Sequence, residues 1–252
     1  MNKPIKSVSA GNIVIGEGDV KICVPILGTT AEEILNNARK AAESPADFFE
    51  WRADYFLSNT DDQINILIKL HEICGERPII FTYRRIAEGG MSVDGDEQYL
   101  KVLCKMADER AAEIFDIEAT LSEQYLNDIL SYVKNNGIKV VLSHHDFKRI
   151  PPDAELLSLY RTMHATDADI IKLAVMPETP EDVQRFIEVS SYFYSNEAKK
   201  PLIAIAMGEM GSVTRVNPAS CGSCVSFAVV DEAFVAGQQN VYELAKILKV
   251  NK

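Results

Sequence analysis

A lysine inside an apolar run is the feature of this chain that most directly predicts chemistry. Lys172 lies within residues 170–176, where every other side chain is apolar and the run has the length of a β-strand. Burying an ammonium costs free energy, and burial lowers the pKa of a lysine toward the range in which the neutral amine is available. A neutral amine can attack a ketone and form a Schiff base. The run therefore predicts a covalent catalyst, and a lysine at a strand rim with its head in water is the alternative.

Other polar side chains lie at the ends of further apolar runs and suggest partners for this lysine. Glu50 and Arg52 are two positions apart, so they share one face of a strand and can neutralise each other. His144 and His145 are adjacent, so they face opposite ways and at most one of them can enter an interior site. Together these residue types predict Schiff-base chemistry on an anionic carbonyl compound. They are a nucleophilic lysine, a histidine for proton transfer, arginines that bind an anion and acids that adjust the pKa values of the other groups. The remaining members of this set are Arg84, Arg85, Glu88, Asp116, Glu118 and Arg215.

The elements that must position these residues follow from an alternation of apolar runs and amphipathic stretches. Apolar stripes at helical spacing mark residues 30–43, 62–74 and 180–194, with Thr179 as a possible N-cap of the last. Near-continuous apolar strands separated by helices are typical of a parallel sheet that is covered on its outside. Eight such runs predict an α/β fold, a (β/α)8 barrel, although a doubly wound open sheet is an alternative that periodicity leaves open. The runs are residues 22–27, 48–54, 78–84, 113–119, 139–146, 170–176, 201–208 and 224–230.

The pattern indicates a single domain over residues 1–252, without a linker or a low-complexity tract. Residues 7–20 contain Gly11, Asn12 and Gly16 and read as a short hairpin before the first barrel strand. We expect residues 1–20 to close the bottom of the barrel. A barrel carries its active site at the carboxyl ends of its strands, which is where the polar side chains collect here.

Composition limits the classes of partner. The net charge is −11, which argues against nucleic acid, and no apolar stretch has the length of a membrane span. The first residues lack a signal-peptide core, so a cytoplasmic location is expected. An odd number of cysteines, five, argues against a disulfide framework. Cys221 and Cys224 have the spacing of a redox pair, which stays an alternative, but no second pair completes a zinc site.

Several segments, in order along essentially the whole chain, resemble the type I 3-dehydroquinate dehydratases. The resemblance implies a (β/α)8 barrel with a short N-terminal hairpin that is commonly a homodimer. It implies dehydration of 3-dehydroquinate, an anionic cyclic ketone, to 3-dehydroshikimate in the shikimate pathway, without a metal or an organic cofactor. The segments are Glu50-Trp51-Arg52-Ala53-Asp54, Phe81-Thr82-Tyr83-Arg84, Glu88-Gly89-Gly90, His145-Asp146-Phe147, Lys172-Leu173-Ala174-Val175-Met176-Pro177, and Met210-Gly211 before Thr214-Arg215.

The resemblance also implies roles for individual residues. Lys172 would form the imine, and His145 would remove the neighbouring proton and then protonate the departing hydroxyl. Glu88 would orient that histidine. The implied substrate-binding residues are Glu50, Arg52 and Arg84 for the hydroxyls, and Arg215 and Gln238 for the carboxylate.

The chain departs from the family pattern in the loop after the last strand. The family sequence Ser-Ala-Pro-Gly-Gln is replaced by Phe234-Val235-Ala236-Gly237-Gln238, so a serine hydroxyl and a proline are lost. The usual Gly-Glu after the Thr-Arg motif is also absent. These changes predict weaker carboxylate binding. They keep two alternatives open, namely a Schiff-base lyase or aldolase for another anionic ketone, and a weakly active binding paralogue.

Overall fold

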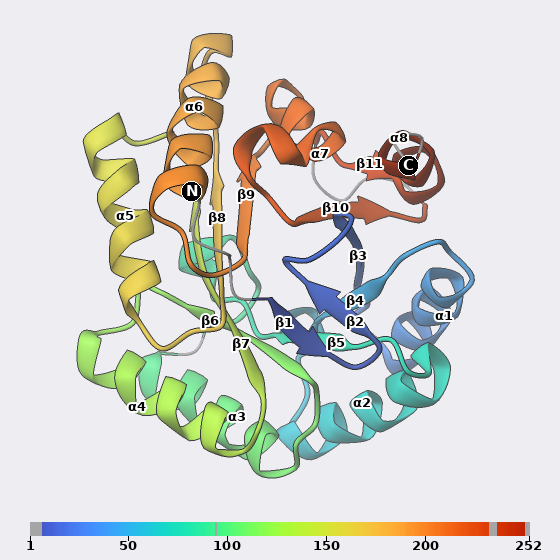
Figure 1. The fold of residues 1–252 in the computed structure, drawn as a ribbon. Coiled ribbons are helices and arrows are strands. Elements are labelled where there is room, and N and C mark those ends of the chain that lie inside the picture. Colours follow the sequence, from blue (N-terminus) through green and yellow to red (C-terminus); the bar gives the residue numbers. More distant parts are fainter. Residues whose placement is uncertain (1–6, 94, 232–235, 250–252) are drawn as a thin grey trace.

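The chain forms a curled parallel sheet surrounded by helices (Figure 1). This computed structural model describes residues 7–93, 95–231 and 236–249. The predicted strands are confirmed within two residues at either end, which is the usual uncertainty of such boundaries. The strands are β3 (Lys21–Ile26), β4 (Phe48–Arg52), β5 (Ile79–Thr82), β6 (Ile114–Glu118), β7 (Lys139–Asp146), β8 (Ile170–Val175), β9 (Leu202–Ala206) and β10 (Val225–Val229), with a short β11 (Gln239–Asn240) beside β10.

Strand order establishes the barrel. From β3 to β9 each strand pairs in parallel with the next strand along the chain, and β10 pairs in parallel with β3. The circle closes between β9 and β10, where the backbone N–H of Cys224 donates to the carbonyl of Leu202 at 2.8 Å. The predicted (β/α)8 barrel is therefore confirmed, and the doubly wound open sheet is not the fold of this chain.

The helices cover the outside of the sheet, and the three predicted helical stretches are confirmed, with starts within two residues of the predicted ones. Thr30 caps the first helix and Thr179 caps the sixth, and each forms a capping box with the acidic residue three positions later. Pro180 occupies the first turn of the sixth helix, where its missing N–H costs nothing. The helices are α1 (Ala31–Ala42), α2 (Thr60–Cys74), α3 (Asp96–Asp108), α4 (Glu123–Asn135), α5 (Asp153–Ala165), α6 (Pro180–Asn196), α7 (Val213–Val216) and α8 (Val241–Lys249).

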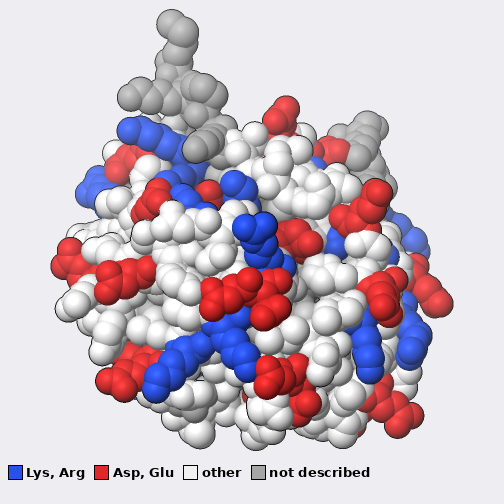
Figure 2. All heavy atoms as spheres, turned by 90° about the horizontal axis from the view of Figure 1, so that it is seen from below, with Lys and Arg blue, Asp and Glu red and all other residues white. Residues whose placement is uncertain are grey.

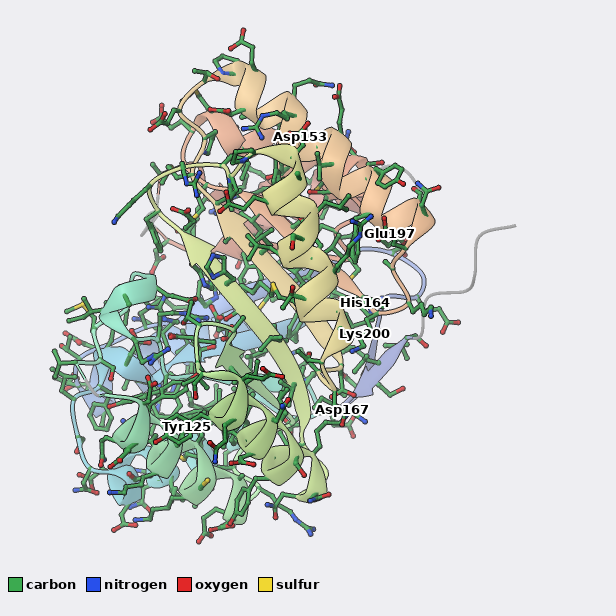
Figure 3. The ribbon with its side chains drawn as sticks, turned by 90° about the vertical axis from the view of Figure 1, so that its left-hand side faces the viewer. Tyr125, Asp153, His164, Asp167, Glu197 and Lys200 are labelled. Carbon is green, nitrogen blue, oxygen red and sulfur yellow. The ribbon has the colours of Figure 1, made fainter. Side chains whose placement is uncertain are left out.

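Ion pairs tie neighbouring helices at their ends. Figure 3 shows α5 and α6 side by side on the outside of β8. Asp153 at the start of α5 pairs with Arg185 of α6 at 3.0 Å, and Glu197 after α6 pairs with Arg161 of α5 at 2.6 Å. On the side that carries α2, α3 and α4, acidic and basic side chains are interspersed (Figure 2). None of the helices within the described residues is long and apolar enough to cross a membrane.

A hairpin fills the end of the barrel opposite the predicted site. Strands β1 (Val8–Ala10) and β2 (Ile13–Ile15) are antiparallel. Their buried side chains Val8, Ala10 and Ile15 belong to one apolar cluster with interior side chains from the barrel strands, such as Ile80 and Val141. A second, larger cluster lies between the sheet and its helices. The interior is therefore packed below the site, so polar groups above it are screened from water on that side.

Candidate active site

A cavity of about 110 Å³ opens at the carboxyl ends of the barrel strands. Its wall combines charged side chains with apolar ones such as Met207 and Phe227, a mixture that is typical of small-molecule sites. Six of the eight residues predicted for the site line this cavity. They are Glu50, Arg52, His145, Lys172, Arg215 and Gln238.

Lys172 is buried in the middle of β8, with 5% of its surface exposed. Its Nζ lies 3.2 Å from Oε1 of Glu50 on β4 and 3.5 Å from Oδ2 of Asp116 on β6. The alternative of a lysine at a strand rim with its head in water is therefore wrong. Because β4, β6 and β8 all turn these side chains inward, the amine is held between two carboxylates at the floor of the cavity.

The two carboxylates beside this amine stay ionised although they are buried. Burial raises the pKa of Glu50, but the charges of Lys172 and Arg52 outweigh it and the net pKa lies below its ordinary value. Asp116 behaves in the same way, because Arg84 and Lys172 outweigh its burial. Thr82 on β5 donates to Oε1 of Glu50 at 3.0 Å. The site thus offers anionic oxygens next to the ammonium, and these can receive a proton from it.

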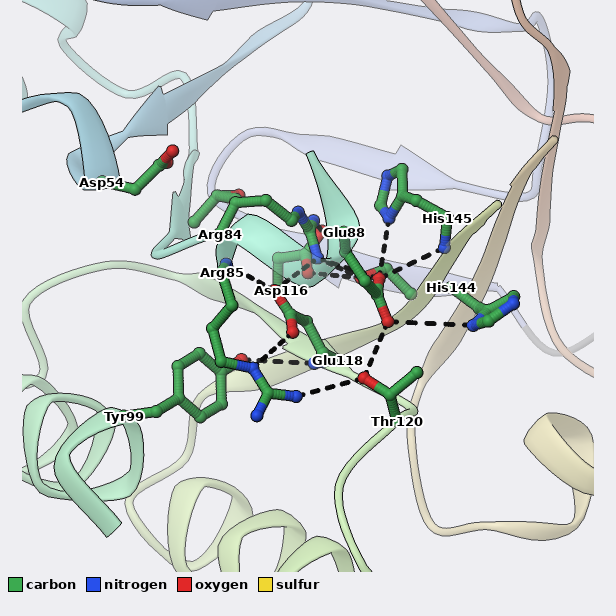
Figure 4. Close-up of polar contacts among 12 residues, drawn as sticks. Asp54, Arg84, Arg85, Glu88, Tyr99, Asp116, Glu118, Thr120, His144 and His145 are labelled. Atoms are coloured by element: carbon green, nitrogen blue, oxygen red, sulfur yellow. Dashed lines mark hydrogen bonds and ion pairs between the residues drawn. The ribbon is translucent and has the colours of Figure 1, made fainter. Parts of the chain in front are cut away.

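Arg84 occupies the centre of a charged network behind the cavity wall (Figure 4). Its Nη2 lies 2.7 Å from Oδ2 of Asp116, and its Nη1 lies 3.4 Å from Oε1 of Glu118 and donates to Ser143 at 2.8 Å. Burial lowers the pKa of Arg84, but the carboxylates of Asp116, Glu118 and Glu88 raise it well above its ordinary value. This guanidinium is therefore committed to protein carboxylates rather than exposed to a ligand.

His145 on β7 is held by Glu88, which lies on the turn Ile86–Glu88 after β5 (Figure 4). Its Nδ1 lies 3.0 Å from Oε2 of Glu88, and its backbone N–H donates to the same oxygen at 3.2 Å. Thr120 donates to the other oxygen at 2.8 Å, and Nδ1 of His144 lies 3.7 Å from it. Both histidines therefore reach one carboxylate, but His145 is the one that lines the cavity.

Burial, together with the positive charge of Arg84, lowers the pKa of His145 to about 4. The imidazole is consequently neutral at neutral pH and can accept a proton. The hydrogen bond to Glu88 raises the pKa of His144. Burial opposes ionisation of Glu88, but hydrogen bonds from His144 and His145 lower its pKa far below the ordinary value.

We expect the acid limb of kcat/KM to lie near pH 4 rather than near 6.5, because only neutral His145 can accept a proton. The stability of the fold changes with pH in the same direction. The unfolded chain protonates this histidine near pH 6.5, whereas the folded chain protonates it only near pH 4. The free energy of unfolding should therefore fall as the pH drops through this window. Steady-state kinetics and urea denaturation over roughly pH 4–8 measure both effects. A kinetic midpoint near 6.5 would contradict the environment described for His145.

Arg215 on α7 differs from the other arginines of the site because it lacks a carboxylate partner among the described residues. Its Nη1 donates to the carbonyl of Phe227 at 3.4 Å, and its buried Nε has no hydrogen-bond partner in that part of the chain. Burial lowers its pKa to about 10. By contrast, Arg52 pairs with both oxygens of Asp54 at 2.9 Å. An unpaired buried guanidinium in a cavity wall is a site for an anion.

Two sequence-based interpretations change with the structure. Glu50 and Arg52 act on each other through their charges but form no direct ion pair, because β4 ends at Arg52 and the turn Ala53–Tyr55 brings Asp54 back onto the guanidinium. Glu88 and Arg84 are not among the residues that line the cavity but stand behind it, in contact with His145 and Asp116. The altered loop residues Phe234 and Val235 lie outside the described residues.

The sequence did not predict which side chains the structure places next to the amine and its carboxylates. Asp116 was visible only as an acid in an apolar run, whereas Thr82 and Ser143 gave no signal beyond their place at strand ends. Phe227 stands in an ordinary apolar strand and gave none. For the cysteine pair, burial raises the pKa of Cys221 to about 11 and that of Cys224 to about 12. Such thiols are poor nucleophiles, which opposes the redox alternative.

Comparisons with known proteins agree with this geometry. The chain is 35% identical to the 3-dehydroquinate dehydratase of Alkaliphilus oremlandii, over 97% of this chain and 96% of the relative. It is 33% identical to that of Enterococcus faecalis, over 97% and 98%. A crystal structure of the type I enzyme from Clostridium difficile with covalently modified comenic acid superposes with a TM-score of 0.92 at 28% identity, covering 99% of this chain and 98% of that one.

The family model described as type I 3-dehydroquinase matches residues 22–252, which include every strand of the barrel except the first residue of β3. Sequence identity and superposition extend over nearly the full length of this chain and of the relatives. The chain belongs to the type I 3-dehydroquinase family.

Proposed function

We propose that this chain dehydrates 3-dehydroquinate to 3-dehydroshikimate through an imine on Lys172, with His145 as the proton-transfer group. The observation that carries the proposal is the amine of Lys172 in a cavity wall, between the carboxylates of Glu50 and Asp116 and beside a neutral imidazole. Family membership supplies the reaction, and the chain is a hydro-lyase. The comenic acid of the Clostridium difficile structure supports covalent chemistry in the family.

Imine formation begins with loss of a proton from the ammonium. Glu50 lies 3.2 Å from Nζ and is positioned to receive it, and Thr82 holds the same carboxylate oxygen. The free amine then attacks the ketone carbon, and the carbonyl oxygen departs as water after it takes one proton from the amine nitrogen and the proton that Glu50 received. The resulting protonated imine is an electron sink, so it acidifies the C–H bond on the neighbouring carbon.

His145 performs the proton transfers of the dehydration. Its Nδ1 points to Glu88, which leaves Nε2 as the ring nitrogen that can face a substrate in the cavity. The neutral imidazole takes the proton next to the imine carbon, and the imidazolium returns it to the hydroxyl that leaves from the next carbon. Water then hydrolyses the imine and regenerates the lysine.

Arg215 is proposed to bind the substrate carboxylate. We expect Arg215→Met to lower kcat/KM for 3-dehydroquinate by roughly 10- to 100-fold, because a charge-assisted contact is lost. The free energy of unfolding should stay level or rise, because the removed charge has no carboxylate partner in the described structure. Steady-state kinetics with the substrate and with an analogue that lacks the carboxylate test this role. Equal losses for both compounds would contradict it.

Arg84→Met is the matched control, since the same substitution at this position removes a guanidinium that contacts Asp116 and Glu118. It removes the closest cation from Asp116 and leaves Glu118 with Arg85 alone, so the free energy of unfolding should fall, by up to roughly 3 kcal/mol. Opposite effects of the two variants on urea denaturation would separate an anion-binding arginine from a structural one.

The remaining parts of the proposal concern binding of hydroxyls, assembly and location. Arg52 and Gln238 line the cavity and are proposed, with Glu50, to contact substrate hydroxyls or the carboxylate. A homodimer in the cytoplasm is also proposed, and sedimentation of the purified protein tests the dimer.

Purified protein mixed with 3-dehydroquinate tests the function itself. We expect enone absorbance to rise at a rate proportional to enzyme concentration, and the same reaction after EDTA treatment should be unchanged. Absence of enone product with a well-folded protein would refute the dehydratase and favour another anionic ketone as substrate.

A further inference from the structure

Phe227 presents an aromatic face to the amine of Lys172. It lies on β10 and is 5% exposed, and the Nζ of Lys172 lies 4.5 Å from its ring centroid. That distance is within the range of about 6 Å in which a ring face attracts a cation, and the attraction is stronger where water is excluded. The ring therefore adds a third favourable surface to the carboxylates of Glu50 and Asp116 around this nitrogen.

The three surfaces respond differently when the amine becomes an imine. An ammonium carries three N–H donors, whereas a protonated imine carries one. Glu50 and Asp116 at 3.2 and 3.5 Å can both bond the ammonium, but a single N–H cannot serve both equally. The ring of Phe227 needs no N–H, because its quadrupole acts on the positive charge itself.

We propose that Phe227 is a catalytic residue whose ring face stabilises the positive charge of the iminium on Lys172. This role rests on the proposed function. In the step concerned, the ammonium and the ketone give an iminium and one water: the N–C bond forms, the C–O bond breaks, and the departing oxygen carries away two of the three ammonium protons. The nitrogen is neutral while the free amine attacks the ketone, and it becomes positive again in the iminium, where the ring face meets it. The ring consequently favours formation of the iminium and its survival until His145 has moved the proton.

A plain apolar wall is the competing role for this residue, since Phe227 also lines the cavity and packs with interior side chains. The two roles separate by electrostatics rather than by size. Fluorine atoms on the ring withdraw π density and weaken cation binding while the ring keeps nearly the same shape and remains apolar.

The experiment places 4-fluoro-, 3,5-difluoro- and 3,4,5-trifluorophenylalanine at position 227 of the full chain. The readouts are the rate at which borohydride traps 3-dehydroquinate on Lys172, followed by mass spectrometry, and kcat/KM. We expect both rates to fall stepwise with each added fluorine, by on the order of tenfold for the trifluoro ring. In the Phe227→Leu variant, which keeps an apolar side chain without a ring, the trapping rate and kcat/KM should fall at least as far.

The matched control places the same fluorinated residues at Phe115 on β6. That ring is fully buried in the cluster outside the barrel, 5.3 Å from the ring of Phe81. The Phe115 series should keep the trapping rate, and thermal denaturation should show that both series remain folded.

Equal trapping rates across the Phe227 series, or the same decline in the Phe115 series, would overturn the role of this ring alone. Failure of the unmodified protein to form any adduct on Lys172 would overturn the proposed function, and the role of Phe227 with it. The two failures are therefore distinguishable in one set of measurements.

Discussion

Replacing Lys172 with methionine is expected to abolish dehydration of 3-dehydroquinate while the barrel stays folded. Methionine fills nearly the same space but has no amine, so the covalent route is closed and no other group at the cavity floor can replace it. The measurement is enone absorbance with enough enzyme to detect a loss of several orders of magnitude. Lys69→Ala, at an exposed position of α2, is the control and should keep full activity.

The same variant should also be less stable than the unmodified protein. The ammonium of Lys172 neutralises Glu50, whose Oε1 lies 3.2 Å from Nζ. Asp116 still has a cation beside it in the variant, because Nη2 of Arg84 lies 2.7 Å from its Oδ2. A buried carboxylate that loses its partner is costly, so the free energy of unfolding should fall by roughly 3 kcal/mol. Urea denaturation measures this change, and circular dichroism confirms the fold. Substantial turnover by the folded variant would refute the imine route.

Replacing His145 with alanine is expected to lower kcat by on the order of 10²–10⁴-fold, the usual contribution of a positioned proton-transfer group. The reason is that the neutral imidazole beside Glu88 is the base that faces the cavity. Because Lys172 remains, the imine should still form and accumulate. The measurement combines turnover with borohydride trapping, and the variant should show a trapped adduct with little enone.

His144→Ala is the control for this result. Both histidines approach Glu88, but Nδ1 of His144 is 3.7 Å from it and the ring does not line the cavity. We expect His144→Ala to change kcat by less than about tenfold. An inactive His144 variant together with an active His145 variant would contradict the assignment. It would show that His144, on the other face of β7, is the proton-transfer group.

The barrel and the position of its lysine could be predicted because both leave local signals. Apolar runs of strand length report burial directly, and a single charge inside such a run stands out, as Lys172 does in β8. The caps at Thr30 and Thr179 are equally local, since a capping box depends on residues three positions apart.

Contacts across the barrel could not be predicted in the same way. The contact between Glu50 and Lys172 joins β4 to β8, which lie far apart in the sequence and meet only when the barrel closes. The pairing of Arg52 with Asp54 depends on where β4 ends, a boundary that periodicity leaves uncertain by a few residues. The family resemblance gave Arg215 its role, but neither the unpaired state of its guanidinium nor the ring of Phe227 over the amine leaves a trace in the sequence.

Sodium borohydride reduction in the presence of 3-dehydroquinate tests the central claim most directly. Reduction converts an imine into a stable secondary amine, so peptide mass spectrometry can locate the bond. We expect a single adduct on the peptide that contains Lys172, inactivation in proportion to that adduct, and no adduct in the Lys172→Met variant. Continued enone formation by a protein that is never trapped at Lys172, or trapping at a different lysine, would contradict the account.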